Sequence, residues 1–445
     1  MAKFKATITA KAKDKTVEQI KRYLQLNDYE VKVTVDPNAT DTVVTGVGPA
    51  PLKNPTLAKL AEQMGVLLPK TSSTYDLVVV GGGPAGLAAA INARSLYGLT
   101  TLIIEQYAPG GTAATAINEI DNYFGFDDGI DAALLCHKAV IQAKKFGAEW
   151  LPSYSAATLK LSDDPTTTKH KITATSAEGS PDVTVSTSLI LIATGLVPRK
   201  LTQPTAAAFE DQGLYYYALP GDAAGVTAKD TIMVIGGGDS AGRAALMFSG
   251  KGAKVVMLIK DTLTKDMLDE VSTLVKADKN ITVVEKTEAT KFEAIKAPSP
   301  DNPNAKLTVT ANNKASYNVT AVYALIGADP QDKWVVDAGV TIIRKKPDDP
   351  VGLVATGLDI FYDAIKNGTF DSKKHADELK NLTDMGTNKP GVFAAGDIRF
   401  RAERRIATAA GEGTEAALSM HNYLKAHPHV LDVEAGRAAP AYYLA

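Results

Sequence analysis

Sulfur is scarce in this chain of 445 residues, which contains a single cysteine, Cys136. One thiol cannot close an intramolecular disulfide, and it cannot form the Cys-x-x-Cys pair of a thiol–disulfide relay. Cys136 lies in a stretch with a helical pattern, residues 130–147, so we expect it to be a buried packing residue. Structural disulfides and dithiol redox chemistry within the chain are therefore both excluded.

Long apolar runs and an excess of charge of either sign are also missing. The densest apolar stretch, residues 189–197, has the length of one strand and cannot span a bilayer as a helix. The net charge of −2 offers no basic surface for nucleic acid. The N-terminus alternates polar and apolar residues and lacks the apolar core of a signal peptide. These absences predict a cytoplasmic protein with no membrane span and no nucleic-acid partner.

A glycine-rich loop between an apolar run and a helix is the most informative feature. Residues 77–80 suit a buried parallel strand, and a G-x-G-x-x-G loop and a helical pattern follow. Such a loop lets backbone reach a pyrophosphate, and the helix N-terminus adds N–H groups and a positive dipole. Glu105 ends the next strand, where a carboxylate holds ribose hydroxyls. The segment therefore predicts a dinucleotide site, with candidate ligands Gly81, Gly83, Pro84, Ala85, Gly86 and Glu105.

A second loop of the same kind, G-x-G-x-x-A, follows the apolar run 232–235. The next strand, 255–259, ends in Lys260 and Asp261 rather than in one clear glutamate. Two dinucleotide folds in one chain are typical of a flavoprotein reduced by NAD(P)H, with one nucleotide held tightly and one that exchanges. The candidate ligands of the exchanging nucleotide are Gly236, Gly238, Asp239, Ser240, Ala241, Lys260 and Lys265.

In the order of its motifs the chain resembles the thioredoxin-reductase group of flavoproteins. The likeness covers "PGGTAATAINEIDNYFGF" after the first loop, the Ala-Thr-Gly at 193–195, "YALIGADP", and "GVFAAGDIRFRAERRIATAAGEGTEAA" near the C-terminus. It implies an α/β fold of two Rossmann-like domains, with an FAD domain split around an inserted NAD(P) domain. Asp397 would bind the ribityl chain, and the backbone at Arg405 and Ile406 would face the flavin at a helix start. The further FAD contacts that it implies are Gly110, Gly111, Thr112 (where the family has glutamine), Asn122, Thr194 and Gly195.

Two departures from the family pattern bear on function. The family's Cys-x-x-Cys would fall near residues 217–220, inside "GLYYYALPGD", where there is no sulfur. The family's NADPH signature H-R-R-x-x-x-R, whose arginines bind the 2′-phosphate, is replaced by "IKDTLTKD". Lys260 and Lys265 could offset phosphate charge, while Asp261 would repel it or accept from a free 2′-hydroxyl. NADPH and NADH therefore both stay open as the second cofactor beside FAD.

The motifs divide the chain into five expected segments. The first is a small N-terminal α/β lobe that resembles part of a thioredoxin-like lobe, with Asn54 expected to cap its second helix. Without cysteine this lobe cannot shuttle disulfides, so a packing or dimer-stabilising role is favoured over a docking site. The segments are 1–72 (lobe), 73–197 (FAD domain, first part), 198–331 (NAD(P) domain), 332–425 (FAD domain, second part) and 426–445 (tail).

Aromatic side chains at two places are candidates to stack on the flavin. Tyr442 and Tyr443 lie in the tail, and related ferredoxin/flavodoxin–NADP reductases place an aromatic ring of a C-terminal extension on the flavin. A tail docked on a partner subunit is an equal alternative. Tyr217 could pack where the dithiol loop was, or shape a pocket over the flavin. His427 and His429 form an H-x-H that we do not interpret as a metal site.

The sequence thus predicts an FAD-dependent NAD(P)H oxidoreductase that lacks the redox dithiol. Its electrons would go directly to an external acceptor, either a redox protein of the ferredoxin or flavodoxin kind or a small molecule such as a quinone. The alternative is a slow or non-catalytic flavoprotein that acts as a sensor or binding module. The resemblance also implies a homodimer, and no catalytic side chain is identified.

Overall fold

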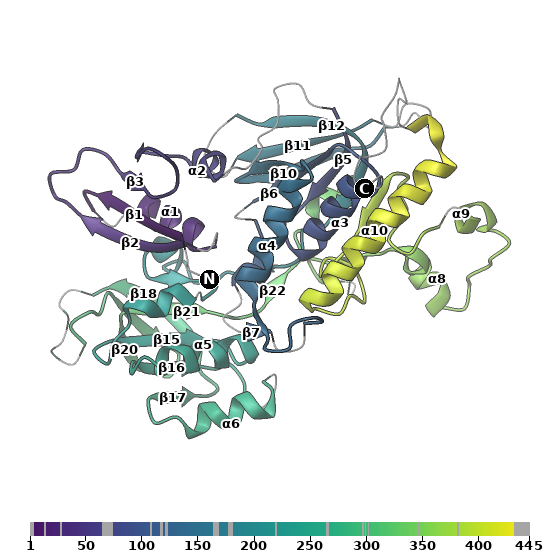
Figure 1. The fold of residues 1–445 in the computed structure, drawn as a ribbon. Helices are drawn as coiled ribbons and strands as arrows, with labels where there is room; N and C mark the ends of the chain where they lie inside the picture. The colour runs from purple at the N-terminus through teal and green to yellow at the C-terminus, as the bar shows by residue number, and fades with distance from the viewer. Residues whose placement is uncertain are drawn as a thin grey trace.

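The chain forms a small N-terminal lobe, a large domain built in two parts, and a smaller domain inserted between those parts (Figure 1). The computed structural model describes residues 4–430 except 13–14, 27–28, 65–73, 107–108, 116–118, 121–122, 163–168, 177–180, 219, 264–266, 296–297, 299, 301, 345–347 and 381.

The N-terminal lobe has a four-stranded sheet of order β2-β1-β3-β4. Strands β1 (Phe4–Ala10) and β2 (Tyr29–Val35) run parallel and are joined by α1 (Lys15–Leu26). Strands β3 (Val43–Thr45) and β4 (Leu52–Lys53) add antiparallel pairs before α2 (Leu57–Gln63). These two strands are not evident from the sequence, because they are too short to show an alternating pattern.

The start of α2 corrects one expectation. Thr56 caps this helix, and its hydroxyl accepts from the Lys59 N–H at 3.1 Å. Asn54 instead adopts a left-handed φ of 42°, and its side chain joins the loop to Thr42 and Asp41. Asparagine suits both roles, since it tolerates left-handed backbone and bonds locally, so sequence alone could not separate them.

The large domain is built on a seven-stranded sheet, six of whose strands have the order β10-β11-β12-β5-β6-β9, with β25 paired to β12. The central pairs are parallel, and α3 follows β5, while the long helix α10 packs along α3 (Figure 1). The bounds are β5 (Thr74–Val80), α3 (Pro84–Ser95), β6 (Thr101–Glu105), α4 (Ala132–Lys145), β9 (Glu149–Pro152), β10 (Tyr154–Lys160), β11 (His170–Ser176), β12 (Val183–Ile192), β25 (Val392–Ala394) and α10 (Ile406–Ala426).

The inserted domain has a five-stranded parallel sheet of order β14-β21-β15-β16-β17 and a three-stranded antiparallel sheet, β18-β19-β20. The chain enters it after β13 and leaves through β22, which pair with each other, so the two crossings lie side by side. The bounds are β13 (Val197–Pro198), β14 (Leu214–Tyr215), β15 (Thr231–Ile235), α5 (Asp239–Ser249), β16 (Lys254–Leu258), α6 (Asp269–Ala277), β17 (Ile281–Val284), β18 (Ala289–Ala294), β19 (Leu307–Ala311), β20 (Ser316–Val319), β21 (Ala321–Ala324) and β22 (Ala328–Asp329).

Short elements complete both domains, with η2 and η3 in the inserted domain and the others in the large domain or in an excursion from it. Helices α8 and α9 stand away from the body at the far side of α10 (Figure 1), in the stretch before β25. These elements are η1 (Gly111–Thr115), β7 (Glu119–Ile120), β8 (Ile130–Asp131), η2 (Ala207–Phe209), η3 (Pro220–Gly225), α7 (Lys333–Val336), β23 (Ile342–Ile343), β24 (Leu353–Val354), η4 (Gly357–Phe361), α8 (Tyr362–Lys366), α9 (Ala376–Lys380) and η5 (Pro428–Val430).

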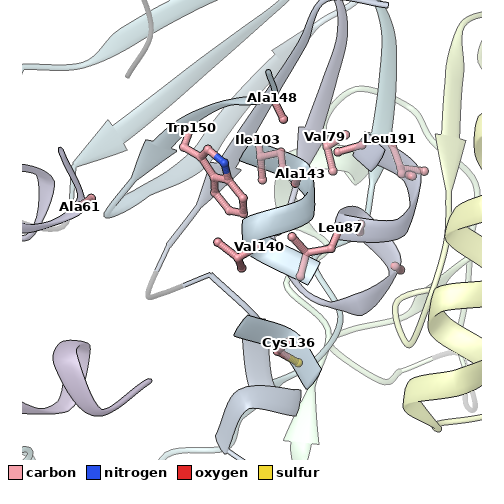
Figure 2. Packing of buried hydrophobic residues seen from close by; sticks show 14 of the residues in the cluster. Ala61, Val79, Leu87, Ile103, Cys136, Val140, Ala143, Ala148, Trp150 and Leu191 are labelled. Carbon is pink, nitrogen blue, oxygen red and sulfur yellow. The ribbon is translucent and has the colours of Figure 1, made fainter. Parts of the chain in front are cut away.

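One hydrophobic cluster joins the lobe to the large domain. Figure 2 shows its centre, where Trp150 of β9 lies beside Val140 of α4 and near Leu87 of α3. Ala61 of α2 belongs to the same cluster, so the lobe shares a core with the large domain. Cys136 lies on α4 in this cluster with 2% of its surface exposed, as its helical pattern predicts.

His170 on β11 is buried and hydrogen-bonded at both ring nitrogens. Its Nδ1 accepts from the Ser162 N–H at 3.2 Å, and its Nε2 lies 3.2 Å from the Pro390 carbonyl oxygen. The neutral ring with its proton on Nε2 satisfies both partners. Burial lowers the pKa of His170 below its usual 6.5, and the contact with Pro390 opposes this only in part.

We expect the free energy of unfolding to fall as pH drops below about 6.5, the pKa of histidine in the unfolded chain. There the unfolded chain takes up a proton that the folded chain, with its lowered pKa, still resists. His170 alone contributes at most about 1.4 kcal/mol per pH unit, until its folded pKa is reached. Urea unfolding of wild type and His170→Gln between about pH 7 and 5 measures this difference. Equal pH slopes for the two proteins would contradict it.

Candidate dinucleotide sites

The first glycine loop is tightly packed on its inner side and open on its outer side. Gly81 ends β5 with φ +107°, and a Cβ there would lie 2.3 Å from the Ala193 carbonyl oxygen. A Cβ on Gly86 would lie 1.9 Å from the Gly81 oxygen, so both positions require glycine. Gly83 is the N-cap residue of α3, and a Cβ there would meet only the Cα of Gly111, at 3.9 Å. The N-terminus of α3 can therefore receive a phosphate group.

Glu105 lies beside this loop, as its place at the end of β6 requires. Glu105 is 6% exposed, and its carboxylate accepts from the Gly82 N–H at 2.6 Å. Trp150 covers the same glycine, since a Cβ on Gly82 would lie 2.9 Å from its ring. No motif in the sequence assigns Trp150 to this site, because it comes from a strand two crossings later. A ribose placed against the loop would meet the Glu105 carboxylate.

Two of the expected neighbours, Gly110 and Gly111, reach the first loop, and Thr112 comes next in the chain. The Gly110 N–H donates to the Gly82 carbonyl at 2.8 Å, and Gly111, with φ +58°, starts η1 against Gly83. Thr112 follows on the same short helix. Asn122, expected in the next stretch, lies outside the described residues.

Two polar side chains, Thr194 and Asp397, lie just after the paired strands β12 and β25. Thr194 has a buried hydroxyl oxygen, and a Cβ on the adjacent Gly195 would have open space around it. Asp397 is half-buried, and burial raises the pKa of its carboxyl; Glu412 raises it further, while Arg404 lowers it. Buried polar groups normally pair, so the Thr194 hydroxyl fits a hydrogen-bonding ligand at these strand ends, where the Asp397 carboxyl can also reach it.

A buried ion pair behind Asp397 holds this strand end in place. Arg399 donates from Nε and Nη2 to the Glu412 carboxylate at 3.1 and 2.9 Å, and from Nη1 to Thr356 at 3.0 Å. The same carboxylate accepts from the Gly396 N–H at 2.7 Å. The sequence did not reveal this pair, because its members belong to a loop and to α10 and are brought together only by folding.

The start of α10 lies next to this pair. Arg405 caps the helix with extended backbone, and Ile406 is its first residue. The helix has 21 residues, so its positive dipole end lies at these two positions.

The second glycine loop repeats the geometry of the first in the inserted domain. Gly236 ends β15 with φ +143°, and a Cβ there would lie 2.3 Å from the Leu325 carbonyl oxygen. Gly238 is the N-cap residue of α5, and Ala241 is fully buried against the loop. The Asp239 carboxylate accepts from the Leu268 N–H at 2.8 Å, while Ser240 is exposed. This helix N-terminus can likewise receive a phosphate group.

The structure describes two of the candidates Lys260, Lys265 and Tyr217, and they lie in different surroundings. Lys260 is exposed, and its ammonium lies 2.8 Å from the Glu288 carboxylate. Lys265 lies outside the described residues. Tyr217 is half-buried against the cluster that the lobe shares with the large domain. Tyr442 and Tyr443 also fall outside the described residues, so stacking on the flavin stays a prediction.

The only thiol is unsuited to nucleophilic chemistry. Burial raises the pKa of Cys136 to about 12, and the nearby Asp131 contributes to the increase. The thiolate fraction at neutral pH is therefore negligible.

The N-terminal lobe contacts the large domain, and it also contacts the inserted domain near residues 213–222. The half-buried Lys144 of α4 donates to the Met64 carbonyl at the end of α2, at 3.0 Å, and the ring centroids of Phe4 and His137 are 6.0 Å apart. On the other side a Cβ on Gly221 would lie 2.5 Å from Nε2 of Gln25. Gly221 follows residues 217–220, where the family's Cys-x-x-Cys would fall. This part of the inserted domain is therefore packed against α1.

No metal-ligand cluster and no membrane-spanning helix occur in the described part of the chain. The described His, Cys, Asp and Glu side chains form no group of three that could hold a metal ion. None of the helices described is long and apolar enough to cross a membrane.

Comparison with known proteins matches this architecture to one family. The pyridine nucleotide-disulphide oxidoreductase family matches residues 75–347. A thioredoxin reductase of Listeria monocytogenes is 30% identical over 365 residues, which cover 82% of this chain and 98% of that protein. The crystal structure of Lactococcus lactis thioredoxin reductase is similar with a TM-score of 0.59 and 25% identity, over 79% of this chain and 99% of that one. Thioredoxin reductase of T. acidophilum has the same fold, with a TM-score of 0.58, 22% identity, and coverage of 79% and 99%.

Proposed function

The chain belongs to the pyridine nucleotide-disulphide oxidoreductase family, as a flavoprotein of the thioredoxin-reductase type, and we propose that it is an FAD-dependent NAD(P)H oxidoreductase that delivers electrons directly to an external acceptor. The observation that carries this proposal is the presence of two complete glycine loops in a chain whose only thiol is buried. The first loop would hold FAD, and the second would hold the exchanging nucleotide. The acceptor is a redox protein or a small molecule such as a quinone.

The first site fits FAD at both ends. The N-terminus of α3 would bind the pyrophosphate, and Glu105 would accept from the ribose hydroxyls. Thr194 and Asp397 would bind the ribityl hydroxyls, because the Thr194 hydroxyl is buried without a hydrogen-bond partner among the described residues and the half-buried Asp397 carboxyl follows the neighbouring strand. When bound, FAD would supply the capacity to accept a hydride from a reduced nicotinamide and to release the electrons onward.

Disulfide reduction is left out of this proposal for a chemical reason. It requires a thiolate that attacks one sulfur and a second thiol that resolves the mixed disulfide. Cys136 supplies one thiol, and its raised pKa of about 12 keeps that thiol protonated. The segment near the expected dithiol position is covered by the lobe, for which we propose a packing role.

Anaerobic titration of the FAD-loaded protein tests the proposal. NADH or NADPH should bleach the visible flavin band, and Cys136→Ser should bleach at the same rate, because the thiol takes no part. An artificial acceptor such as ferricyanide or a quinone should then support turnover, whereas thioredoxin disulfide should not. If neither nucleotide bleached the flavin, the enzyme would give way to a flavin-binding sensor. Disulfide turnover that Cys136→Ser abolished would overturn the dithiol-independent route.

A further inference from the structure

Acidic side chains follow three neighbouring parallel strands of the inserted domain. Strands β15, β16 and β17 lie side by side in that order, so their carboxyl ends share one edge of the sheet. Ligands of doubly wound sheets bind at this edge, with the ribose of the adenosine beyond the second strand. Asp239 follows β15, Asp261 follows β16, and Glu285 and Glu288 follow β17.

Backbone hydrogen bonds hold the turns after β16 and β17 together beside the glycine loop. The Thr287 N–H donates to the Ile259 carbonyl at 2.9 Å, and the Lys286 N–H donates to the Asp261 carbonyl at 3.1 Å. The side chain of Ile259 packs under the loop, 2.9 Å from where a Cβ on Gly237 would stand. The acidic turns therefore border the place where the adenosine ribose would lie.

One described cation of these segments, Lys260, is already paired with a carboxylate. Lys260 follows Gly236 at the same sequence distance at which Glu105 follows Gly81, but its ammonium is paired with Glu288 at 2.8 Å. This pairing also raises the pKa of Lys260. Among the other described cations, Lys286 stands between the two glutamates of its turn, and Arg243 lies about one helical turn along α5.

The arginines of the family's NADPH signature are absent here. The stretch that replaces this signature, residues 259–266, contains no arginine, and Asp261 directly follows the lysine at its second position. A 2′-phosphate placed at this edge would lie near Asp261 and the acidic turn after β17, and carboxylates repel a phosphate. A free ribose diol would instead donate hydrogen bonds to a carboxylate.

We propose that this site selects NADH over NADPH, and that Asp261 determines the choice by accepting from the 2′-hydroxyl. The inference rests on the proposed function, since it concerns the electron donor of the same site. It goes beyond that function because it names one nucleotide and the residue that distinguishes it.

Binding of the oxidised nucleotides tests the selection without depending on electron transfer. Calorimetry of the FAD-loaded protein with NAD⁺ and NADP⁺, at one fixed ionic strength, should give a Kd at least about tenfold lower for NAD⁺, the ratio that a difference of about 1.4 kcal/mol produces. Asp261→Asn should lower the Kd for NADP⁺ and raise that for NAD⁺. Glu293→Gln is the matched control, because it removes one exposed carboxylate of the same domain on β18, away from the strand ends.

The outcomes separate this inference from the proposed function. Equal or tighter binding of NADP⁺, no binding of either nucleotide, or a nucleotide preference that Asp261→Asn leaves unchanged would each overturn the selection. A preference that Glu293→Gln shifted as much as Asp261→Asn would also overturn it, since net charge would then explain the effect. If NAD⁺ binds as expected but NADH fails to bleach the flavin, the selection stands and the oxidoreductase proposal falls.

Discussion

A methyl group added at Gly413 should separate α10 from α3 and release the flavin, whereas the same change at Gly411 should do neither. A Cβ on Gly413 would lie 2.0 Å from the Ala85 carbonyl oxygen and 2.8 Å from its carbonyl carbon. These are backbone atoms of the first turn of α3, so no side-chain rotation relieves the clash. The helices must move apart, and that turn carries the dinucleotide loop. We expect Gly413→Ala to cost about 3 kcal/mol or more.

Gly411→Ala is the matched control on the same helix. Gly411 is exposed and a Cβ there would meet no atom within 4 Å. Alanine is the better helix former by about 1 kcal/mol, so this variant should be as stable as wild type or slightly more so. Urea unfolding and retention of FAD during gel filtration measure both effects. Equal stability of the two variants would show that α10 and α3 are less closely packed than the structure indicates.

Local motifs were predictable from the sequence because each depends on a few consecutive residues. The clash distances at Gly81 and Gly86 show why glycine is required there, and the strand before and helix after the loop follow from short patterns. The family relation and the fold with two dinucleotide-binding domains were predicted from these local motifs, and the comparisons confirm both. The assignment of individual ligand residues stays a prediction.

Features that depend on segments distant in the sequence could not be predicted. Arg399 and Glu412 form their pair only when α10 packs behind β25, and Trp150 reaches Gly82 only across the parallel sheet. The position of the lobe depends on the bond from Lys144 to the Met64 carbonyl and on a shared hydrophobic cluster. None of these contacts leaves a periodic pattern or a motif in the chain.

Replacing Glu412 by glutamine should strongly destabilise the large domain. The Glu412 carboxylate accepts from Arg399 and from the Gly396 N–H, and the side chains of the ion pair are only 17% (Arg399) and 9% (Glu412) exposed. An amide can accept through one atom only, so the guanidinium is left partly unpaired in a buried place. Breaking such a pair costs about 3–5 kcal/mol. FAD should also be released more readily, because Gly396 and Asp397 form the strand end that would hold the ribityl chain.

The cost should come from the uncompensated charge, and a matched set of variants can show this. Asp337→Asn makes the same chemical change in an exposed pair with Lys333, whose side chains are 86% (Lys333) and 62% (Asp337) exposed, and should cost less than about 1 kcal/mol. In Glu412→Gln the pKa of Asp397 should fall, since the Glu412 charge helps to raise it.

The double variant Arg399→Met/Glu412→Gln removes the guanidinium charge that Glu412→Gln leaves uncompensated. It should recover part of the stability that Glu412→Gln loses, as measured by urea unfolding. Methionine fills much of the volume of the arginine stem and needs no polar partner. The Gly396 N–H can still donate to the amide oxygen of the glutamine introduced on α10, so the strand end keeps its bond to that helix. If the double variant were less stable than Glu412→Gln, the pair would be needed for its geometry, and the explanation from buried charge would be wrong.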